Sequence, residues 1–67
     1  MDYVPPERHE IRALRDKYGH TRAEAAAMLG VSERTWLNWE YGNSKMRGLY
    51  YRVYEIVGAE HSKNAAG

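Results

Sequence analysis

Apolar residues recur at helical spacing near the start of the chain. Ile11, Leu14 and Tyr18 are three and four residues apart, as on one buried face of an α-helix. This stripe predicts a helix over about residues 6–18. Gly19 follows directly and suits the end of a helix, because glycine readily adopts left-handed backbone angles.

The middle of the chain carries the signals of two short helices. Thr21 and Glu24 form a capping-box pattern, in which each side chain binds the other residue's backbone N–H at the start of a helix. Gly30 is expected to end this second helix, and Ser32 to cap the next one. The third helix is predicted over residues 33–41.

A last helix is predicted from the pattern after residue 46. It begins there or, after a short turn, at Gly48, and Gly58 is expected to end it. Its expected core stripe consists of three apolar residues at helical spacing, Leu49, Val53 and Ile56. The polar, small residues that follow predict a loose tail.

These elements and the length of 67 residues predict one all-α domain, residues 1–67, built as a compact bundle of four to five helices. Residues 1–5 are expected to be an extended lead-in and residues 59–67 the loose tail. The chain has no cysteine, and its three histidines lack metal-ligand spacing, so we expect no metal and no cofactor. No stretch resembles a membrane span or a signal peptide, which predicts a cytoplasmic protein with no membrane partner.

The third helix separates two kinds of side chain. At 100° per residue, Trp36 and Trp39 lie on one side with Glu40, while Arg34 and Asn38 lie on the opposite side. A small domain without phenylalanine needs large side chains in its core, so the two rings are expected to be buried. The alternative is that they are exposed platforms on which bases or a ligand stack.

The second and third helices have the spacing of a helix-turn-helix. Ala26 would let the two helices approach closely, and Gly30 would let the chain turn sharply between them. Trp36 and Trp39 would hold the second of these helices against the first. Each of these features alone is weak evidence, but together with the capped helix starts they strongly indicate a helix-turn-helix.

The segment "TRAEAAAMLGVSERTWLNWEYGNSKM" resembles the Cro/repressor-type helix-turn-helix family, which is also called xenobiotic-response-element-like or lambda-repressor-like. It departs from the family's usual residues at Arg22, Trp36 and Met46. The resemblance implies a lambda-repressor-like bundle of five helices that binds double-stranded DNA in the major groove. It also implies a structural ion pair between Arg15 and Glu40.

The outward side of the third helix holds the expected base contacts. Arg34 is the best candidate, because a guanidinium can bind both acceptors of guanine, and Asn38 can match adenine. Leu37 suits a thymine methyl group, and Thr35 a base or a phosphate. Glu33 either accepts from cytosine or holds Arg34 in place.

Phosphate contacts are expected at two places beside that helix. Arg22 and the free N–H groups at the start of the second helix form one. The other is a group of hydroxyl, amide and cationic donors after the third helix, although a solvated turn would look similar. Its members are Tyr41, Asn43, Ser44, Lys45 and Arg47.

A single helix-turn-helix reads few base pairs, so a homodimer on a palindromic operator is expected. Tyr50, Tyr54 and Val57 are the candidate dimer contacts, unless they complete the core instead. The net charge of +1 is only weak evidence for an anionic partner, so such a partner must be inferred from where the charges lie in the chain.

Two functions are compatible with these observations. The first is a transcriptional regulator, a small Cro-like repressor of phage type that blocks polymerase and has no small-molecule effector. The alternative is a protein-interaction module, such as an antitoxin-like adaptor with the same fold. No arrangement of catalytic residues is recognisable, so we expect no enzyme activity.

Overall fold

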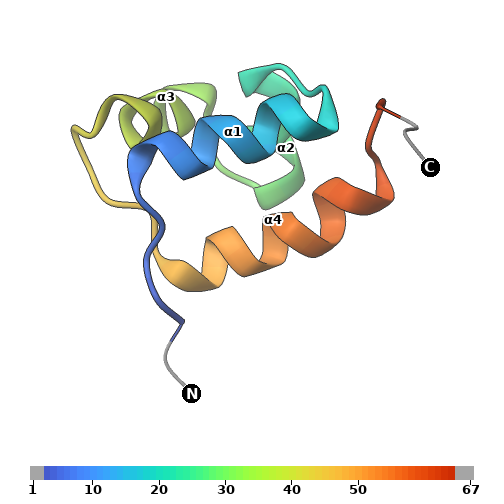
Figure 1. Cartoon of the computed structure of the whole chain (residues 1–67). Coiled ribbons are helices and arrows are strands. Elements are labelled where there is room, and N and C mark those ends of the chain that lie inside the picture. Colours follow the sequence, from blue (N-terminus) through green and yellow to red (C-terminus); the bar gives the residue numbers. More distant parts are fainter. Residues whose placement is uncertain (1–2, 65–67) are drawn as a thin grey trace.

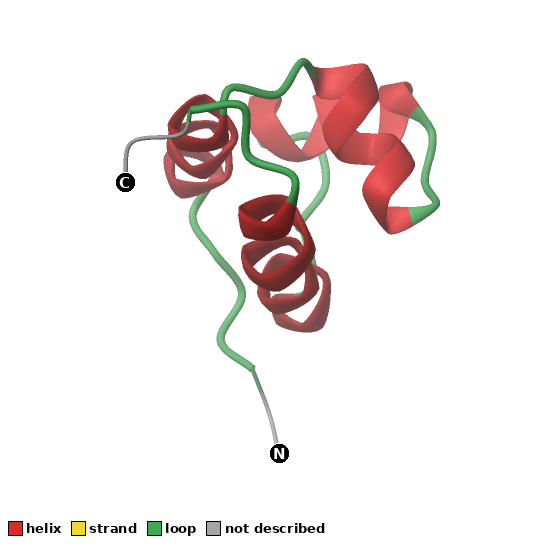
Figure 2. Ribbon diagram, turned by 90° about the vertical axis from the view of Figure 1, so that its right-hand side faces the viewer, coloured by secondary structure: helices red, strands yellow, loops and turns green. Residues whose placement is uncertain are grey.

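The computed structural model describes residues 3–64, which form four α-helices and no strand (Figures 1 and 2). The all-α prediction is confirmed, with four helices in this part of the chain rather than the five that the family resemblance implies. The helices are α1 (Arg8–Tyr18), α2 (Arg22–Leu29), α3 (Glu33–Tyr41) and α4 (Gly48–Glu60).

The ends of α2 and α3 follow from local hydrogen bonds, as predicted. The N–H of Glu24 donates to the Thr21 hydroxyl over 3.1 Å, and the N–H of Thr21 donates to the Glu24 carboxylate over 2.8 Å. The Ser32 hydroxyl accepts from the N–H of Thr35 at 3.1 Å. Gly30 ends α2 with φ of +71°, a conformation that other residues rarely adopt.

Helix α1 begins later than predicted. Its N-cap is Glu7, whose N–H donates to the Glu10 carboxylate over 2.8 Å, so Pro6 lies before the helix and not in its first turn. Residues 3–7 have no regular secondary structure, and Glu7 has extended backbone angles, whereas residues 1 and 2 lie outside the described part of the chain.

The core is built from aromatic rings. Helices α1 and α2 each pack against both α3 and α4. Trp36 is completely buried, and its ring meets Trp39 and Tyr54 edge-on at centroid distances of 5.8 and 5.0 Å. Ala25 and Ala26 are also buried, so α2 approaches these rings closely. The prediction that both tryptophans face the interior is confirmed.

Helix α4 is rotated about its axis relative to the prediction. Tyr54 is 0% exposed and faces the core, whereas Leu49 is 53% and Ile56 48% exposed. The expected core stripe is therefore wrong. Tyr54 fills the core because its ring contacts Trp36 and its hydroxyl lies 2.7 Å from Nδ1 of buried His20.

Gly58 does not end α4, which continues to Glu60. A Cβ at this position would lie 2.7 Å from the ring of Tyr18 and 2.9 Å from that of Tyr54. The glycine therefore serves close packing against α1 and not the end of the helix.

The prediction of a loose tail is wrong for residues 59–64. Ala59 and Glu60 belong to α4, and the N–H of Lys63 donates to the carbonyl of Tyr18 over 2.8 Å. The Asn64 amide donates to two carbonyls at the end of α1. Residues 65–67 lie outside the described part. Within residues 3–64, no helix is long and apolar enough to cross a membrane.

Candidate nucleic-acid interface

The outward side of α3 carries five of the side chains singled out in the sequence. Four of them turn away from the buried pair Trp36 and Trp39, as the 100° spacing predicts, and Glu33 lies at the margin in the first turn. Three of the five are exposed and two are half-buried, and all are available to a partner. They are Glu33, Arg34 and Tyr41, which are exposed, and Leu37 and Asn38, which are half-buried.

An open hollow of about 440 Å³ lies between the start of α2 and this side of α3. The structure thus brings together residues predicted for base contacts and residues predicted for phosphate contacts. Two arginines and one glutamate are among them, so the hollow has a cationic excess. Its lining consists of Arg22, Glu33, Arg34, Leu37 and Tyr41.

Glu40 fixes the inner side of α3. Its carboxylate accepts from Arg15 at 2.6 and 3.1 Å, from Arg22 at 3.1 Å, and from the indole N–H of Trp36 at 2.5 Å. The carboxylate side chain is only 2% exposed. The pair of Arg15 and Glu40 that the resemblance implies is therefore present, and it includes two further donors that the sequence did not predict.

The protonation of this cluster follows from its surroundings. Burial acts to raise the pKa of Glu40, but the hydrogen bonds from Arg15, Trp36 and Arg22 outweigh it and hold the pKa below its ordinary value. The hydrogen bond to Glu40 raises the pKa of Arg15. The cluster is therefore an ionised pair in which every buried charge has a partner.

Arg22 links the buried cluster to the hollow. Its Nε donates to Glu40, and its guanidinium lies 5.7 Å from the centre of the Tyr41 ring, a cation–π distance. About a third of the side chain is exposed. Arg22, which the sequence predicts as a phosphate contact, is thus held in one position, with one edge of its guanidinium facing Glu40.

Thr35 lies apart from the outward side. Its hydroxyl is 2.9 Å from the hydroxyl of Ser32, and its backbone N–H donates to the same oxygen. The residue is half-buried at the inner margin of α3. Thr35 therefore contributes to the helix start, and a base contact from it would require its hydroxyl to leave Ser32.

The connection between α3 and α4 presents the other predicted phosphate contacts. Backbone N–H groups of Asn43 and Ser44 donate to the carbonyl of Asn38, which fastens the turn to α3. The side chains of Asn43, Ser44, Lys45 and Arg47 are exposed, but none of them lines the hollow beside α2. They form a second, separate group.

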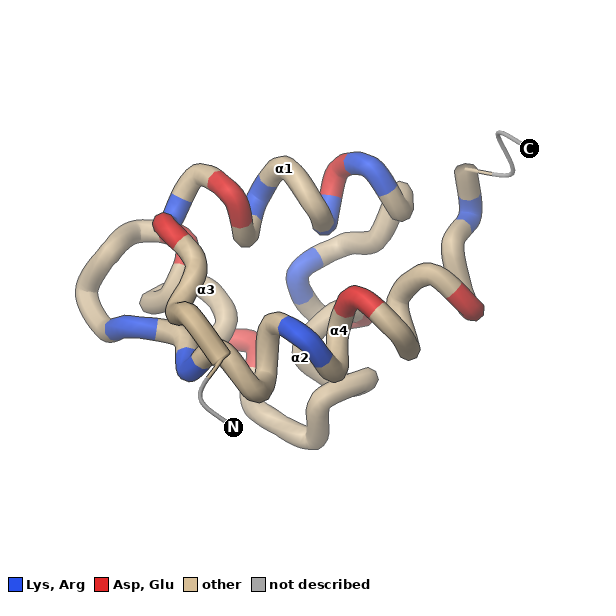
Figure 3. The backbone as a smooth tube through the Cα atoms, turned by 60° about the horizontal axis from the view of Figure 1, so that its bottom comes forward, with Lys and Arg blue, Asp and Glu red and all other residues tan. Residues whose placement is uncertain are grey.

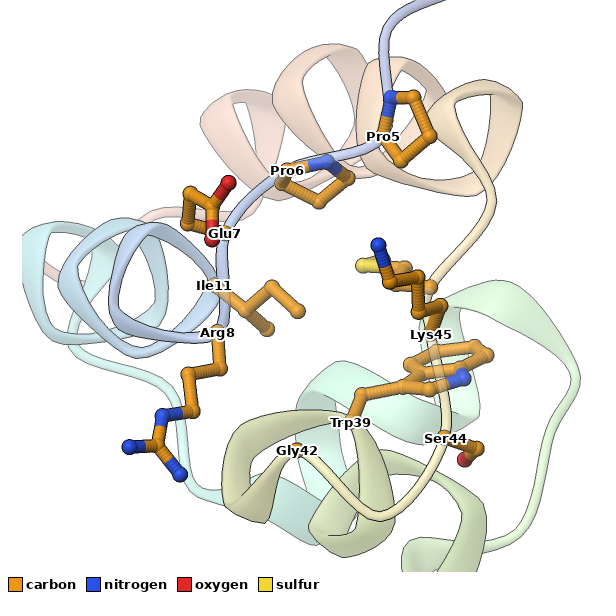
Figure 4. A pocket seen from close by; sticks show the side chains of 10 residues that line it. Pro5, Pro6, Glu7, Arg8, Ile11, Trp39, Gly42, Ser44 and Lys45 are labelled. Carbon is orange, nitrogen blue, oxygen red and sulfur yellow. The ribbon is translucent and has the colours of Figure 1, made fainter.

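Arg8 joins this second group, which the sequence did not predict. Its guanidinium donates to the carbonyl of Tyr41 over 3.3 Å, across 33 residues of sequence. It lines a cleft of about 170 Å³ between the lead-in and the turn after α3, into which Ile11 and Trp39 point (Figure 4). Lys45 extends along the same cleft. No sequence pattern marks Arg8, because its position depends on how α1 and α3 pack.

Elsewhere the charges are mixed. Cationic and anionic residues are interspersed along α1 (Figure 3), where Arg12 and Asp16 form an exposed pair at 3.7 Å. Within residues 3–64, no group of three histidine, aspartate or glutamate side chains could hold a metal ion.

The three predicted dimer contacts lie on one side of α4 but differ in exposure. Tyr54 is buried in the core, so its assignment is wrong. Tyr50 is partly exposed and its ring lies 5.6 Å from that of Trp39, while Val57 is half-buried.

No protein-family model matches the chain. Over 41 residues the chain is 34% identical to a type II methyltransferase, M.MspI, of a Moraxella species. The match covers 61% of this chain and 10% of that protein, so the chain spans about a tenth of the length of the curated relative that it matches. The similarity is thus to one short segment of a much longer enzyme.

Proposed function

We propose that the chain is a sequence-specific DNA-binding transcriptional regulator in which α2 and α3 form a helix-turn-helix. The observation that carries this proposal is the two-sided character of α3. Its inner side is held by Trp36, Trp39 and Glu40, while its outer side shares one hollow with the start of α2. A rigid helix with exposed hydrogen-bonding groups suits the major groove, which admits one α-helix.

In this proposal the outer side of α3 reads base edges. The exposed guanidinium of Arg34 binds O6 and N7 of guanine, and the amide of Asn38, one turn further on, binds adenine. Leu37 flanks this pair and contacts a thymine methyl group. Glu33 accepts from cytosine or orients Arg34.

The two flanking groups bind the DNA backbone. Arg22 is fixed by Glu40 and Tyr41 at the edge of the hollow, so its remaining N–H groups can meet a phosphate without loss of side-chain freedom. On the other flank, Lys45, Arg47 and Arg8 supply cations around the turn after α3. These contacts set orientation and affinity but not base preference.

The protein would act by occupying an operator, as a Cro-like repressor does, with no cofactor, effector or catalysis. A palindromic operator would be bound by two copies, with half-sites about 10 bp apart. Because the match to the methyltransferase covers a tenth of that enzyme, its activity is not part of the proposal.

Selection from a random duplex library, followed by fluorescence anisotropy, tests the proposal. The wild type should select one sequence, and Arg34→Ala should cost roughly 1–3 kcal/mol and relax preference at one base pair. Arg12→Ala is a matched control, because Arg12 is exposed on α1 away from the hollow. Absence of selection by the wild type, or an unchanged preference in Arg34→Ala, would contradict the proposal.

The exposed apolar residues of α4 favour a second candidate, a protein-interaction module or antitoxin-like adaptor. Measuring the sequence preference for DNA distinguishes the two candidate functions. An adaptor would bind a protein partner through α4 and show no sequence preference for DNA at any salt concentration.

A further inference from the structure

Three side chains of α3 with different chemistry line the hollow beside α2 together. They are the carboxylate of Glu33, the apolar side chain of Leu37 and the guanidinium of Arg34. At 100° per residue, Leu37 lies between the other two around the helix axis, about 40° from Glu33 and about 60° from Arg34. A hydrogen-bond acceptor, an apolar contact and a forked donor are therefore next to one another in this order.

The carboxylate of Glu33 is free to accept a hydrogen bond from a partner. Within residues 3–64, neither Glu33 nor Arg34 forms an ion pair. Consecutive residues of a helix do not face each other, so the structure favours a base contact for Glu33 over a role in orienting Arg34. Phosphates repel a carboxylate, which is stable at a DNA surface only where a base supplies a donor. The amine donors in the major groove are N4 of cytosine and N6 of adenine.

Leu37 distinguishes between these two donors. Its half-buried side chain suits a methyl group at C5 of a pyrimidine. In a thymine–adenine pair, the acceptor O4 lies between the thymine methyl group and the adenine amine, so a carboxylate beside Leu37 would meet an acceptor. In 5-methylcytosine, the methyl group and the amine are on adjacent ring atoms. This one base therefore satisfies both Glu33 and Leu37.

We propose that the hollow binds 5-methylcytosine next to the guanine that Arg34 contacts, so that the protein distinguishes methylated from unmethylated DNA. Glu33 accepts from the N4 amine, and Leu37 contacts the 5-methyl group. Unmethylated cytosine satisfies only Glu33, and thymine satisfies only Leu37. The inference rests on the proposed function and narrows its base contacts to a modified base.

Selection from two random duplex libraries tests the proposal, one with cytosine and one with 5-methylcytosine in its place. Fluorescence anisotropy then compares duplexes of the selected site that differ only in the base pair beside the guanine. The wild type should bind the 5-methylcytosine duplex about four-fold more tightly than the cytosine duplex, because one methyl-sized group leaves water. The thymine duplex should bind at least about five-fold more weakly than the 5-methylcytosine duplex, because O4 then faces Glu33.

Two substitutions assign the contacts to residues. Leu37→Ala should bind the methylated and unmethylated duplexes equally, whereas the matched control Leu49→Ala should keep the wild-type preference, because Leu49 is exposed on α4 and does not line the hollow. Glu33→Gln should bind thymine as tightly as 5-methylcytosine, because an amide can donate to O4. Circular dichroism shows whether each variant is folded, and the comparison of duplexes in the wild type does not depend on any variant.

Three outcomes overturn the inference and leave the proposed function intact. They are equal binding of methylated and unmethylated duplexes by the wild type, binding of thymine as tight as that of 5-methylcytosine, and a selected site without cytosine beside guanine. A methyl preference that survives in folded Leu37→Ala would overturn the contact assigned to Leu37. If the wild type selects no sequence from either library, the proposed function fails and this inference fails with it.

Discussion

Glu40 is the residue on which the placement of α3 depends most. Its two carboxylate oxygens accept from Arg15, Arg22 and Trp36, which belong to all three of the first helices. Removing its charge takes the buried carboxylate from both arginines, and Arg15 then has only the exposed carboxylate of Asp16, 3.8 Å away. We expect Glu40→Gln to lower the free energy of unfolding by about 3 kcal/mol, the lower end of the range for a buried pair, because Arg22 is partly exposed.

Urea unfolding monitored by tryptophan fluorescence measures this loss. Glu33→Gln is the control, because it makes the same chemical change on the exposed side of α3. It should alter the free energy of unfolding by less than about 0.5 kcal/mol. Equal effects of the two substitutions would show that the Glu40 cluster adds nothing to stability.

The same carboxylate makes stability depend on pH. The folded pKa of Glu40 is below its ordinary value of 4.5, and hydrogen bonds from the Lys63 side chain and the Thr21 N–H lower the pKa of Glu24 to about 2. A carboxylate with a lowered pKa stabilises the fold above its unfolded pKa, and this contribution is lost as the pH falls through the folded pKa. The wild type should therefore lose stability between pH 4.5 and about 2.

Unfolding curves at a series of pH values test this. The free energy of unfolding should fall less steeply with pH in Glu40→Gln, and less steeply in Glu24→Gln, than in the wild type. A wild-type value that is unchanged between about pH 6 and pH 3 would exclude a linked carboxylate.

At the residue scale, the sequence predicted which side of α3 is buried. It did not predict every residue that contacts this buried side. The burial of Trp36 and Trp39 follows from helical spacing and the need for large side chains. The pair of Arg15 and Glu40 followed from the family resemblance alone. Arg22 was assigned only to phosphate, because nothing local shows that its Nε reaches a carboxylate 18 residues away.

At the element scale, the ends of helices were predictable wherever local hydrogen bonds determine them. Thr21 and Ser32 cap their helices as expected, and Gly30 adopts a left-handed conformation. The rotation of α4 was not predictable in this way. Its sequence carries two apolar sides, one with Leu49 and one with Tyr54, and only packing against Trp36 decides which is buried.

A substitution of Gly58 distinguishes the effect of side-chain packing from that of helix propensity, because the two predict opposite changes in stability. Helix propensity alone predicts that Gly58→Ala stabilises α4 by about 1 kcal/mol. The structure predicts the opposite, because the new Cβ would lie 2.7 Å from the ring of Tyr18. We expect a net loss of roughly 1–3 kcal/mol, as for overpacked cores. Thermal and urea unfolding measure it, and a stabilised variant would refute the close contact between α1 and α4.

At the scale of the whole molecule, contacts between segments that are distant in the chain could not be predicted from the sequence. Lys63 binds the carbonyl of Tyr18, and Arg8 binds that of Tyr41. Neither contact has a local signal, since each depends on the finished packing of the helices. As a result, the tail was predicted to be loose, and one cation beside the turn after α3 was missed.

The distribution of charge over the whole molecule determines how DNA binding should respond to salt. The net charge is only +1, so long-range attraction is weak, and the dependence should come from the few cations that meet phosphates. With Arg8, Arg22, Lys45 and Arg47 in contact, the logarithm of the binding constant should fall with the logarithm of salt concentration with a slope of about −3.6 per chain. Lys45→Ala should reduce the magnitude of this slope by about 1 and weaken all sequences alike.

Anisotropy titrations over a range of salt concentrations measure the slope. Lys17→Ala is the matched control, because Lys17 is exposed on α1 and lines neither the hollow beside α2 nor the cleft beside Arg8. It should leave the slope unchanged, since a cation that meets no phosphate releases no counterion on binding. If Lys17→Ala and Lys45→Ala changed the slope equally, the DNA would respond to overall charge and not to the group of cations beside α3.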